Sequence, residues 1–392
     1  MLDLLVAAPT GEALPRDPAG EAEIISALAE RLGLSEEDLR ASKLFEPLPP
    51  TGNAFFDSEE EIFLDRFAFS NVRPRLKVQK IYATGKMQAG GVQMLAVRVR
   101  NESAFPVASH GEHPVYLSYH WLDAAGKAVA FEGRRTHLPV DVKPGQAITA
   151  HVQVEAPSEY KRLSLKVVPV QELVSWLEDD GETVEIEFSS APPPSLPRFD
   201  DDRPFSEALD DVLSAQFLGR HLDSASEPIL GLEIGGGTMA ALSRWAWANG
   251  GKATVINGDV SVRLLRIAAL LSAKGGDTVT LHARFDANSL PIQAATLDAA
   301  VFCRSLHHFE DPVRVMRECR RVLKPDGLLF LLCEPVATEY DEPTKALIRA
   351  GVNEQMFPLD AYDAMIADAG FKWVDAACDW GFSLKAALRK AG

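Results

Sequence analysis

Three consecutive glycines carry the first chemical signal in this chain. They follow a short apolar run and precede a helical pattern, in the stretch Ile229-Leu-Gly-Leu-Glu-Ile-Gly-Gly-Gly-Thr-Met239. Glycine has no Cβ and tolerates positive φ, so a strand–turn–helix junction of this kind brings the backbone close to a ligand. The carboxyl end of a strand is also where open α/β sheets bind their ligands. We therefore expect Gly235, Gly236 and Gly237 to line a cofactor site.

The glycine pattern by itself suits two kinds of cofactor. Gly235-x-Gly237-x-x-Ala240 satisfies the relaxed dinucleotide fingerprint, and Asp259 follows at roughly the distance of a ribose-binding acid. A nicotinamide or flavin oxidoreductase is therefore one alternative. Glu233 argues against it, because a carboxylate two residues before the glycines repels a pyrophosphate and can bind a cofactor that carries an ammonium group.

Further motifs follow the glycines in order along the chain. They are Ile256-Asn-Gly-Asp-Val-Ser261, Phe285-Asp-Ala-Asn-Ser-Leu-Pro291, Leu297-Asp-Ala-Ala-Val-Phe-Cys-Arg-Ser-Leu-His-His-Phe309, Arg317-Glu-Cys-Arg-Arg-Val-Leu-Lys-Pro-Asp-Gly-Leu-Leu-Phe-Leu331, and two apolar runs at 371–378 and 382–388. With the glycine turn, residues 205–390 resemble the class I S-adenosylmethionine-dependent methyltransferases of small molecules and glycans. The resemblance implies a doubly wound, Rossmann-like α/β sheet that ends in an antiparallel hairpin, with S-adenosyl-L-methionine as the cofactor.

The resemblance also implies which residues hold the cofactor. Asp259 would accept hydrogen bonds from two ribose hydroxyls, a geometry that suits a carboxylate. Asp286 and the backbone N–H of Ala287 would bind the adenine ring. The full set of expected cofactor-binding residues is Glu233, Gly235, Gly236, Gly237, Asp259, Val260, Asp286, Ala287 and Cys303. The simpler alternatives are a helix N-cap for Asp259 and a turn cap for Asp286.

One position departs from the pattern of the family. Met239 stands where the family commonly has glycine. Its side chain could crowd the carboxylate end of the cofactor, or it could pack beneath the following helix. A degenerate domain is therefore a further alternative, in which the chain is a glycan-binding protein without methyltransferase activity.

Candidate catalytic residues follow the expected fourth and fifth strands of this sheet. His307 and His308 come directly after the fourth, and a histidine near its unperturbed pKa of ~6.5 could take the proton of an attacking hydroxyl. Because strand side chains alternate, we expect only one of the two to face the cofactor. Glu334 is a second candidate base or an anchor for the acceptor. The alternatives are wall or capping roles for the histidines and an ion pair for Glu334.

A segment further along would form a lid over the acceptor. It includes Tyr340 and Asn353-Glu-Gln-Met-Phe-Pro358, whose aromatic rings are candidates for acceptor contact. Surface packing explains these rings equally well.

Composition excludes several classes of function. The net charge of −16 argues against a nucleic-acid partner, which needs clustered Lys and Arg. No run approaches the ~20 apolar residues of a membrane span. The N-terminus carries an acid where a secretory signal carries a base, so we expect a cytoplasmic protein. The four cysteines form no Cys-x-x-Cys pair, and His110 with His113 are too few for a site, so we expect no metal ion.

The chain divides into four regions by texture. Residues 1–70 read as a helical appendage, 71–190 as short strands, 191–204 as a proline-rich linker, and 205–392 as the methyltransferase domain. Strand spacing in 71–190 predicts an immunoglobulin-like β-sandwich. Motifs such as Pro114-Val-Tyr-Leu-Ser-Tyr-His-Trp-Leu-Asp123 resemble a module that accompanies bacterial surface-polysaccharide enzymes and O-antigen transporters. That resemblance implies glycan recognition. A structural or dimerisation role is the alternative.

Together these patterns predict an S-adenosylmethionine-dependent O-methyltransferase of polysaccharide biosynthesis. Its acceptor would be a sugar hydroxyl of a bacterial glycan or of a glycan precursor. A methyltransferase for another small acceptor is the alternative, in which the β module only positions subunits of a homo-oligomer.

Overall fold

The computed structural model describes residues 36–37, 73–111, 113–158, 162–190, 204–223, 228–238, 240–250, 253–275 and 280–392. The appendage expected at 1–70 lies outside the described residues except for the helical pair 36–37, and so does the linker expected at 191–204 except for residue 204. Met239 also lies outside them. The domain boundaries inferred from the sequence therefore stay predictions.

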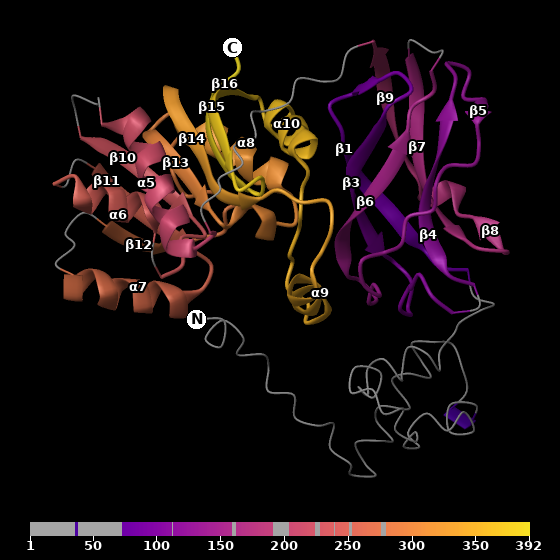
Figure 1. Ribbon diagram of the computed structural model, residues 1–392. Helices are drawn as coiled ribbons and strands as arrows, with labels where there is room; N and C mark the ends of the chain where they lie inside the picture. Colours follow the sequence, from indigo (N-terminus) through magenta and orange to yellow (C-terminus); the bar gives the residue numbers. More distant parts are fainter. Residues whose placement is uncertain are drawn as a thin grey trace.

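Two β-sheets form the region from Leu76 to Ser189, which Figure 1 draws in indigo and magenta. The smaller sheet has three antiparallel strands, in the order β1 (Leu76–Tyr82), β3 (Val92–Asn101) and β6 (Ala147–Glu155). The larger sheet has the order β2 (Lys86–Gln88), β9 (Glu182–Ser189), β7 (Arg162–Gln171), β4 (Val115–Leu122) and β5 (Ala128–Ala130), with β8 (Ser175–Trp176) paired to β7 and a 3-10 turn, η1 (Glu178–Asp180), before β9. We call this region the β module.

One hydrophobic core joins the two sheets of the β module. Strand side chains alternate, so β1 buries Leu76 and Val78 while Lys77 between them is exposed. Leu95 of β3 and Trp121 of β4 are buried in the same cluster, although they come from different sheets. The short strands expected in residues 71–190 are present as β1 to β9. The immunoglobulin-like classification stays a prediction.

The remainder of the chain forms a Rossmann-like sheet of seven strands, in the order β12-β11-β10-β13-β14-β16-β15. Its elements are α5 (Glu207–Leu222), β10 (Ile229–Ile234), α6 (Ala241–Ala248), β11 (Ala253–Asp259), α7 (Val262–Gly275), β12 (Thr280–Arg284), β13 (Leu297–Cys303), η2 (Leu306–His308), α8 (Pro312–Val322), β14 (Leu323–Pro335), α9 (Glu342–Arg349), α10 (Leu359–Asp368), β15 (Phe371–Asp379) and β16 (Ser383–Lys390). The pairs from β12 to β14 are parallel, whereas β16 runs antiparallel to both of its neighbours. The expected terminal hairpin is therefore confirmed as β15 and β16.

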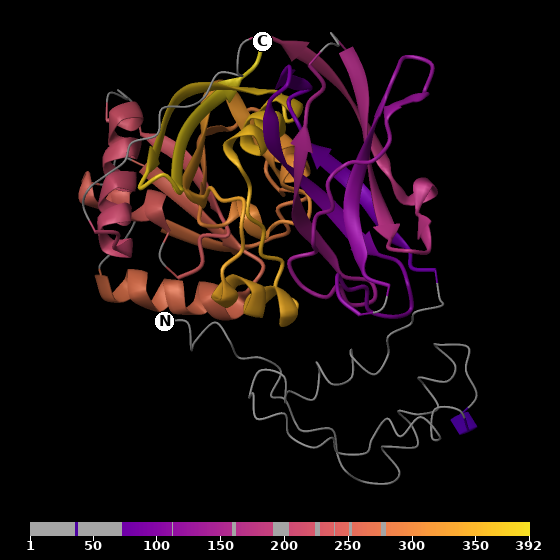
Figure 2. The same cartoon turned by 45° about the vertical axis from the view of Figure 1, so that its right-hand side comes forward.

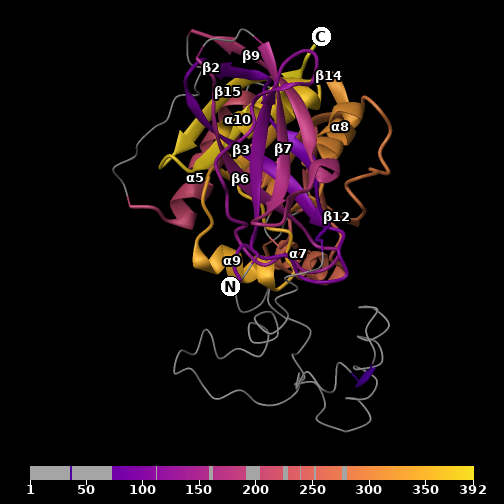
Figure 3. The same ribbon diagram turned by 90° about the vertical axis from the view of Figure 1, so that its right-hand side faces the viewer.

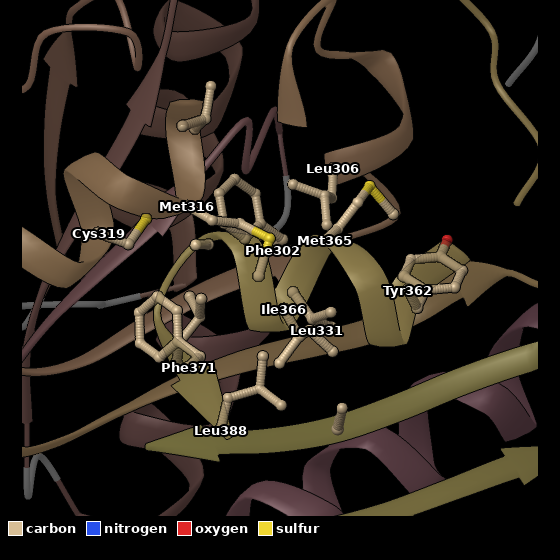
Figure 4. Close-up of a cluster of buried hydrophobic side chains, with 14 of the residues drawn as sticks. Phe302, Leu306, Met316, Cys319, Leu331, Tyr362, Met365, Ile366, Phe371 and Leu388 are labelled. Carbon is tan, nitrogen blue, oxygen red and sulfur yellow. The ribbon is translucent and has the colours of Figure 1, made fainter. Parts of the chain in front are cut away.

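Helices cover both faces of this sheet because successive strand residues point to opposite sides. Val301 of β13 packs in the cluster that contains Phe217 of α5 and Trp245 of α6. Its neighbour Phe302 packs in the opposite cluster, where Figure 4 shows Met316 of α8 near side chains of α10 and of β14. The carboxyl ends of the parallel strands remain as the edge at which polar residues gather.

The β module packs directly against the Rossmann-like part. Helix α10 contacts β1 and β3. Figures 1 and 2 show the sheet β1-β3-β6 on the side of the β module that faces α10, and Figure 3 shows the β module in front of the Rossmann-like part. Tyr82 of β1 is buried in the core beneath α10, and Tyr340 and Ile348 are buried in the core of the β module. The exchange of side chains between the two cores holds the parts in one arrangement. Among the helices of the described residues, none has the length and apolar character that crossing a membrane requires.

Candidate functional site

The glycine turn after β10 adopts the backbone that only glycine accepts readily. Gly235 and Gly237 have φ of +67° and +53°. The N–H of Gly235 donates to Gly258 O of the neighbouring strand β11 over 2.8 Å. A Cβ on Gly235 would lie 2.9 Å from the Cβ of Ser305, whereas a Cβ on Gly237 would meet nothing within 4 Å. Gly235 therefore allows close packing against the end of β13, and Gly237 borders open space.

Glu233 has a structural task that the sequence did not predict. It is 1% exposed, and its two carboxylate oxygens accept hydrogen bonds from the backbone N–H groups of Ala241 and Leu242, each over 2.7 Å. The N-cap residue of α6, Ala240, has no side chain that accepts a hydrogen bond. Glu233 therefore accepts from the free N–H groups of the first turn of α6 in its place. Burial raises the pKa of Glu233 to about 7, although the two N–H donors act in the opposite direction. Its expected contact with an ammonium group stays a prediction.

Asp259 joins the end of β11 to the glycine turn. One carboxylate oxygen accepts from the N–H of Ser261 over 2.7 Å, and the other accepts from the N–H of Gly237 over 3.2 Å. Asp259 is not the N-cap of α7, because α7 begins at Val262 and the hydroxyl of Ser261 accepts from the N–H of Leu264 over 3.3 Å. Asp259 instead caps the turn before that helix and lies beside the glycine turn. Each oxygen keeps a free lone pair with which it could accept a further hydrogen bond. The adjacent Val260 is 63% exposed.

Asp286 lies on the next loop of the same sheet edge. The N–H of Phe285 donates to Asp259 O over 3.4 Å, which ties the two loops together. Asp286 itself accepts from the backbone N–H and the side-chain amide of Asn288, each over 2.9 Å, so the turn cap considered as an alternative is present. Ala287 is 3% exposed. Its N–H and the Asp286 carboxylate keep their adenine-binding role as a prediction.

Cys303 ends β13 on the other side of the glycine turn. A hydrogen bond with Cys333 and burial both raise the pKa of its thiol. The side chain therefore faces the next strand, and the backbone of Cys303 is the part that could contact a cofactor.

These residues fit S-adenosylmethionine. Gly237 has a left-handed backbone with open space beside it, and its N–H donates to the carboxylate of Asp259. A polar adenosine derivative needs both a backbone that allows close approach and an acidic partner for its hydroxyls.

Glu334 anchors the turn that carries the two histidines. It is 0% exposed, and one of its oxygens accepts from the N–H groups of Ser305 and Leu306 over 2.8 and 2.9 Å. The other oxygen accepts from Nδ1 of His307 over 2.8 Å. With no exposed atom, Glu334 is placed to position His307. Its expected role as a base or as an acceptor anchor stays a prediction.

Glu354 completes a cluster with both histidines, and sequence reasoning did not single it out. Its two oxygens lie 3.4 Å from Nε2 of His307 and 3.1 Å from Nδ1 of His308. Burial by itself would lower the pKa of His307, yet the carboxylates of Glu334 and Glu354 raise it to about 9. The His307 side chain is 7% exposed and that of His308 is 45% exposed, so only one ring of the pair is open to a ligand.

Two aromatic residues expected in a lid are instead core residues. Phe357 is 0% exposed, and Tyr340 is 8% exposed and donates to Thr149 O of the β module over 2.8 Å. The expectation that they contact an acceptor was wrong, because the β module covers this segment. Nothing in the sequence near Tyr340 or Phe357 indicates that the β module buries them.

Gln355 connects the β module to the histidine turn. Its Oε1 accepts from Nη1 of Arg98 over 3.1 Å and from the hydroxyl of Thr149 over 2.7 Å. Its Nε2 donates to the carbonyl oxygens of His307 and Phe309 over 3.2 and 2.6 Å. The sheet β1-β3-β6 therefore supports the backbone on which both histidines lie.

Part of this chain is similar in sequence to known proteins. Residues 232–331 match a family described as "Methyltransferase domain". The chain is 29% identical over 117 residues to a ubiquinone biosynthesis O-methyltransferase of Xanthomonas axonopodis pv. citri (strain 306), which covers 30% of this chain and 46% of that protein. It is 32% identical over 102 residues to a ubiquinone/menaquinone biosynthesis C-methyltransferase of Acidiphilium cryptum (strain JF-5), covering 26% and 40%.

The sequence matches to these two relatives are partial. The chain spans less than half the length of these two relatives. A solved S-adenosylmethionine-dependent methyltransferase from Aquifex aeolicus is 16% identical, with a TM-score of 0.38, over 48% of this chain and 100% of that one. Residues 232–331 are therefore similar to a methyltransferase domain, and the match supports S-adenosylmethionine as the cofactor.

Proposed function

We propose that this chain transfers a methyl group from S-adenosylmethionine to a small acceptor molecule. The observation that carries the proposal is the left-handed, open Gly237 held against Asp259 within the segment that matches the methyltransferase domain. When bound, the cofactor supplies a sulfonium methyl that an acceptor atom can attack in line. The protein then has to hold the two partners in alignment.

We propose that the glycine turn binds the cofactor and that the acceptor lies beside the histidine turn, at the same edge of the sheet. The glycine turn and Asp259 would bind the cofactor. Ser305 links that turn to the histidine turn, because its hydroxyl donates to Ile234 O over 2.7 Å. His308 has the exposed ring of the histidine pair, so an acceptor in the neighbouring space would contact His308 and not His307.

The acceptor is proposed only as a small molecule. The two relatives are named for O- and C-methylation in the biosynthesis of quinones, so their names support neither a sugar nor a particular attacking atom. The sugar hydroxyl expected from the sequence therefore has no support from them. We propose that the β module is a structural support of the histidine turn, because Arg98 and Thr149 reach that turn through Gln355.

Two glycine variants test the cofactor site with matched strain. Gly237 and Gly250 both have positive φ, and an added Cβ would meet nothing within 4 Å at either. Gly237→Ala and Gly250→Ala should therefore cost similar stability, of about 1 kcal/mol. Only Gly237→Ala should weaken the binding of S-adenosylmethionine in calorimetry, because only that methyl group enters the proposed cofactor site.

The reaction itself is tested with the labelled cofactor. The unaltered protein is incubated with methyl-labelled S-adenosylmethionine and a panel of phenolic, quinol and sugar acceptors, and label in the products is measured by mass spectrometry. Transfer to any acceptor supports the proposal, and the acceptor names the substrate class. Absence of S-adenosylmethionine binding would defeat it. Binding of NAD in its place would favour an oxidoreductase.

A further inference from the structure

We propose that His307, His308 and Glu354 form a binding site for a divalent first-row cation, of which Zn²⁺ is the reference case. The ligand atoms would be Nε2 of His307, Nδ1 of His308 and the carboxylate of Glu354. These atoms all lie within 4.8 Å of one another. The site goes beyond methyl transfer and does not depend on it.

The spacing of the atoms suits one ion. Two ligand atoms that each lie ~2.1 Å from a tetrahedral ion are ~3.4 Å apart. Oε1 of Glu354 lies 3.4 Å from Nε2 of His307, and Oε2 of Glu354 lies 3.1 Å from Nδ1 of His308, so the ion would lie between the carboxylate and the two rings. Nδ1 of His308 also lies 3.3 Å from Asn353 O, a contact that the ion would replace. Imidazole nitrogen and carboxylate oxygen are ligands that Zn²⁺ commonly takes. Small rotations of the two rings would complete the geometry.

The histidine that lies deepest already has the partner that metal-binding histidines need. Nδ1 of His307 lies 2.8 Å from Oε2 of Glu334, which leaves Nε2 directed at Glu354. A carboxylate on the far nitrogen orients a ligating imidazole and raises its basicity. Glu334 is held in turn by the N–H groups of Ser305 and Leu306.

The third ligand comes from a distant segment that is held rigidly opposite the histidines. Asn353 donates through its amide to His308 O over 2.8 Å, and Gln355 donates to His307 O over 3.2 Å. Glu354 lies between these two anchors. Its carboxylate therefore faces the histidines without the entropy cost of ordering a free loop.

One side of the cluster is open. His308 is 45% exposed, whereas Glu354 is 10% exposed and His307 is 7% exposed. Three protein ligands with an open side are the arrangement of catalytic zinc sites, in which an oxygen donor takes the remaining position. Because the histidine turn follows β13 next to the glycine turn, that oxygen would come from water or from the methyl acceptor.

Cobalt spectroscopy tests the site without any assay of activity. The full-length, tag-free protein is treated with a chelator, dialysed and titrated with Co²⁺, whose visible d–d bands report coordination by nitrogen and oxygen. We expect one Co²⁺ per chain, with bands that disappear as Zn²⁺ displaces it. His308→Ala and Glu354→Gln should each weaken the affinity at least ~10-fold. His110→Ala is the matched control, because His110 pairs with Asp141 over 3.0 Å on an exposed surface and should change nothing.

The alternative explanation is a protonated His307 that bridges Glu334 and Glu354 without an ion. It predicts no d–d band and no saturable Zn²⁺ binding, and that result would overturn the proposal. Equal affinity in the parent, His308→Ala and Glu354→Gln would also overturn it, because the metal would then bind elsewhere. His308 is exposed, so His308→Ala should fold, which a thermal melt verifies. S-adenosylmethionine binding in the same samples separates failure of this site from failure of the proposed methyl transfer.

Discussion

Replacing Gln355 with leucine removes one of the connections between the β module and the histidine turn. The side chain is 0% exposed and makes four hydrogen bonds. Its oxygen accepts from Arg98 and Thr149, and its nitrogen donates to the carbonyls of His307 and Phe309. Leucine has a similar volume but neither donors nor acceptors, so Gln355→Leu isolates the polar contribution.

The expected loss of stability follows from the groups left without partners. Arg98 keeps its bond to Asn353 over 2.7 Å, so the Thr149 hydroxyl and the two carbonyls lose most. Each buried polar group that loses its partner costs ~1–3 kcal/mol. Three such groups toward the lower end of that range give a loss of about 4 kcal/mol. For a domain of this size the melting temperature should fall by roughly 10 °C.

Scanning calorimetry of the full chain measures this effect, with Gln146→Leu as the control. Gln146 lies at the same interface and donates to Ile348 O over 2.9 Å, but it is only partly buried. Water can replace its bond, so Gln146→Leu should cost less than ~1 kcal/mol. If the two variants melt within about 2 °C of each other, the Gln355 network does not carry the interface and the reasoning fails.

Three further perturbations have defined outcomes. Asp259→Ala should weaken the binding of S-adenosylmethionine in calorimetry by at least ~1.4 kcal/mol, because a charge-assisted contact is lost; unchanged affinity in a folded variant would contradict the cofactor assignment. Lys385→Met removes the cation that lies 2.6 Å from the buried carboxylate of Asp210, and it should lower the free energy of unfolding by ~3 kcal/mol. The control Lys80→Met, at an exposed ion pair, should lower it by less than ~1 kcal/mol. Equal melting temperatures for the two variants would show that the buried pair contributes little. Because burial raises the pKa of Glu233 from 4.5 to about 7, the folded state keeps a proton there that the unfolded state has lost, so stability falls as pH rises between those values. Glu233→Gln lacks this part of the slope, and parallel melting curves for parent and variant across that range would be inconsistent with the shift.

Local sequence patterns were sufficient to predict many of the strands and turns and their order along the chain. The sequence predicted short strands in residues 71–190, where the structure has β1 to β9, since the strand period decides which side chains enter a core. The three glycines predicted the turn after β10, because the positive φ of Gly235 and Gly237 leaves few other choices of residue. The ordered motifs predicted a Rossmann-like sheet with a terminal hairpin.

The roles of single acidic residues depended on contacts that no local pattern contains. Glu233 looked available to a cofactor, but α6 begins without a capping side chain and its N–H groups take both carboxylate oxygens. Glu334 was expected to be a base or an acceptor anchor, and that role stays a prediction; the structure adds that it is fully buried and accepts a hydrogen bond from His307. In each case a buried carboxyl group accepts from the nearest backbone donors, because a buried polar group without a partner costs free energy.

The sequence by itself determined which residues are apolar, where the chain turns, and the order of strands and helices along the chain. Only the tertiary structure decided that Glu354 faces His307 and His308, and that the β module reaches the same turn through Gln355. The hydrophobic pattern predicts that an apolar face of a helix or strand is buried, but it does not predict which distant segment buries that face. Partners far apart in the chain meet only when two cores have packed together, so their chemistry is a property of the fold.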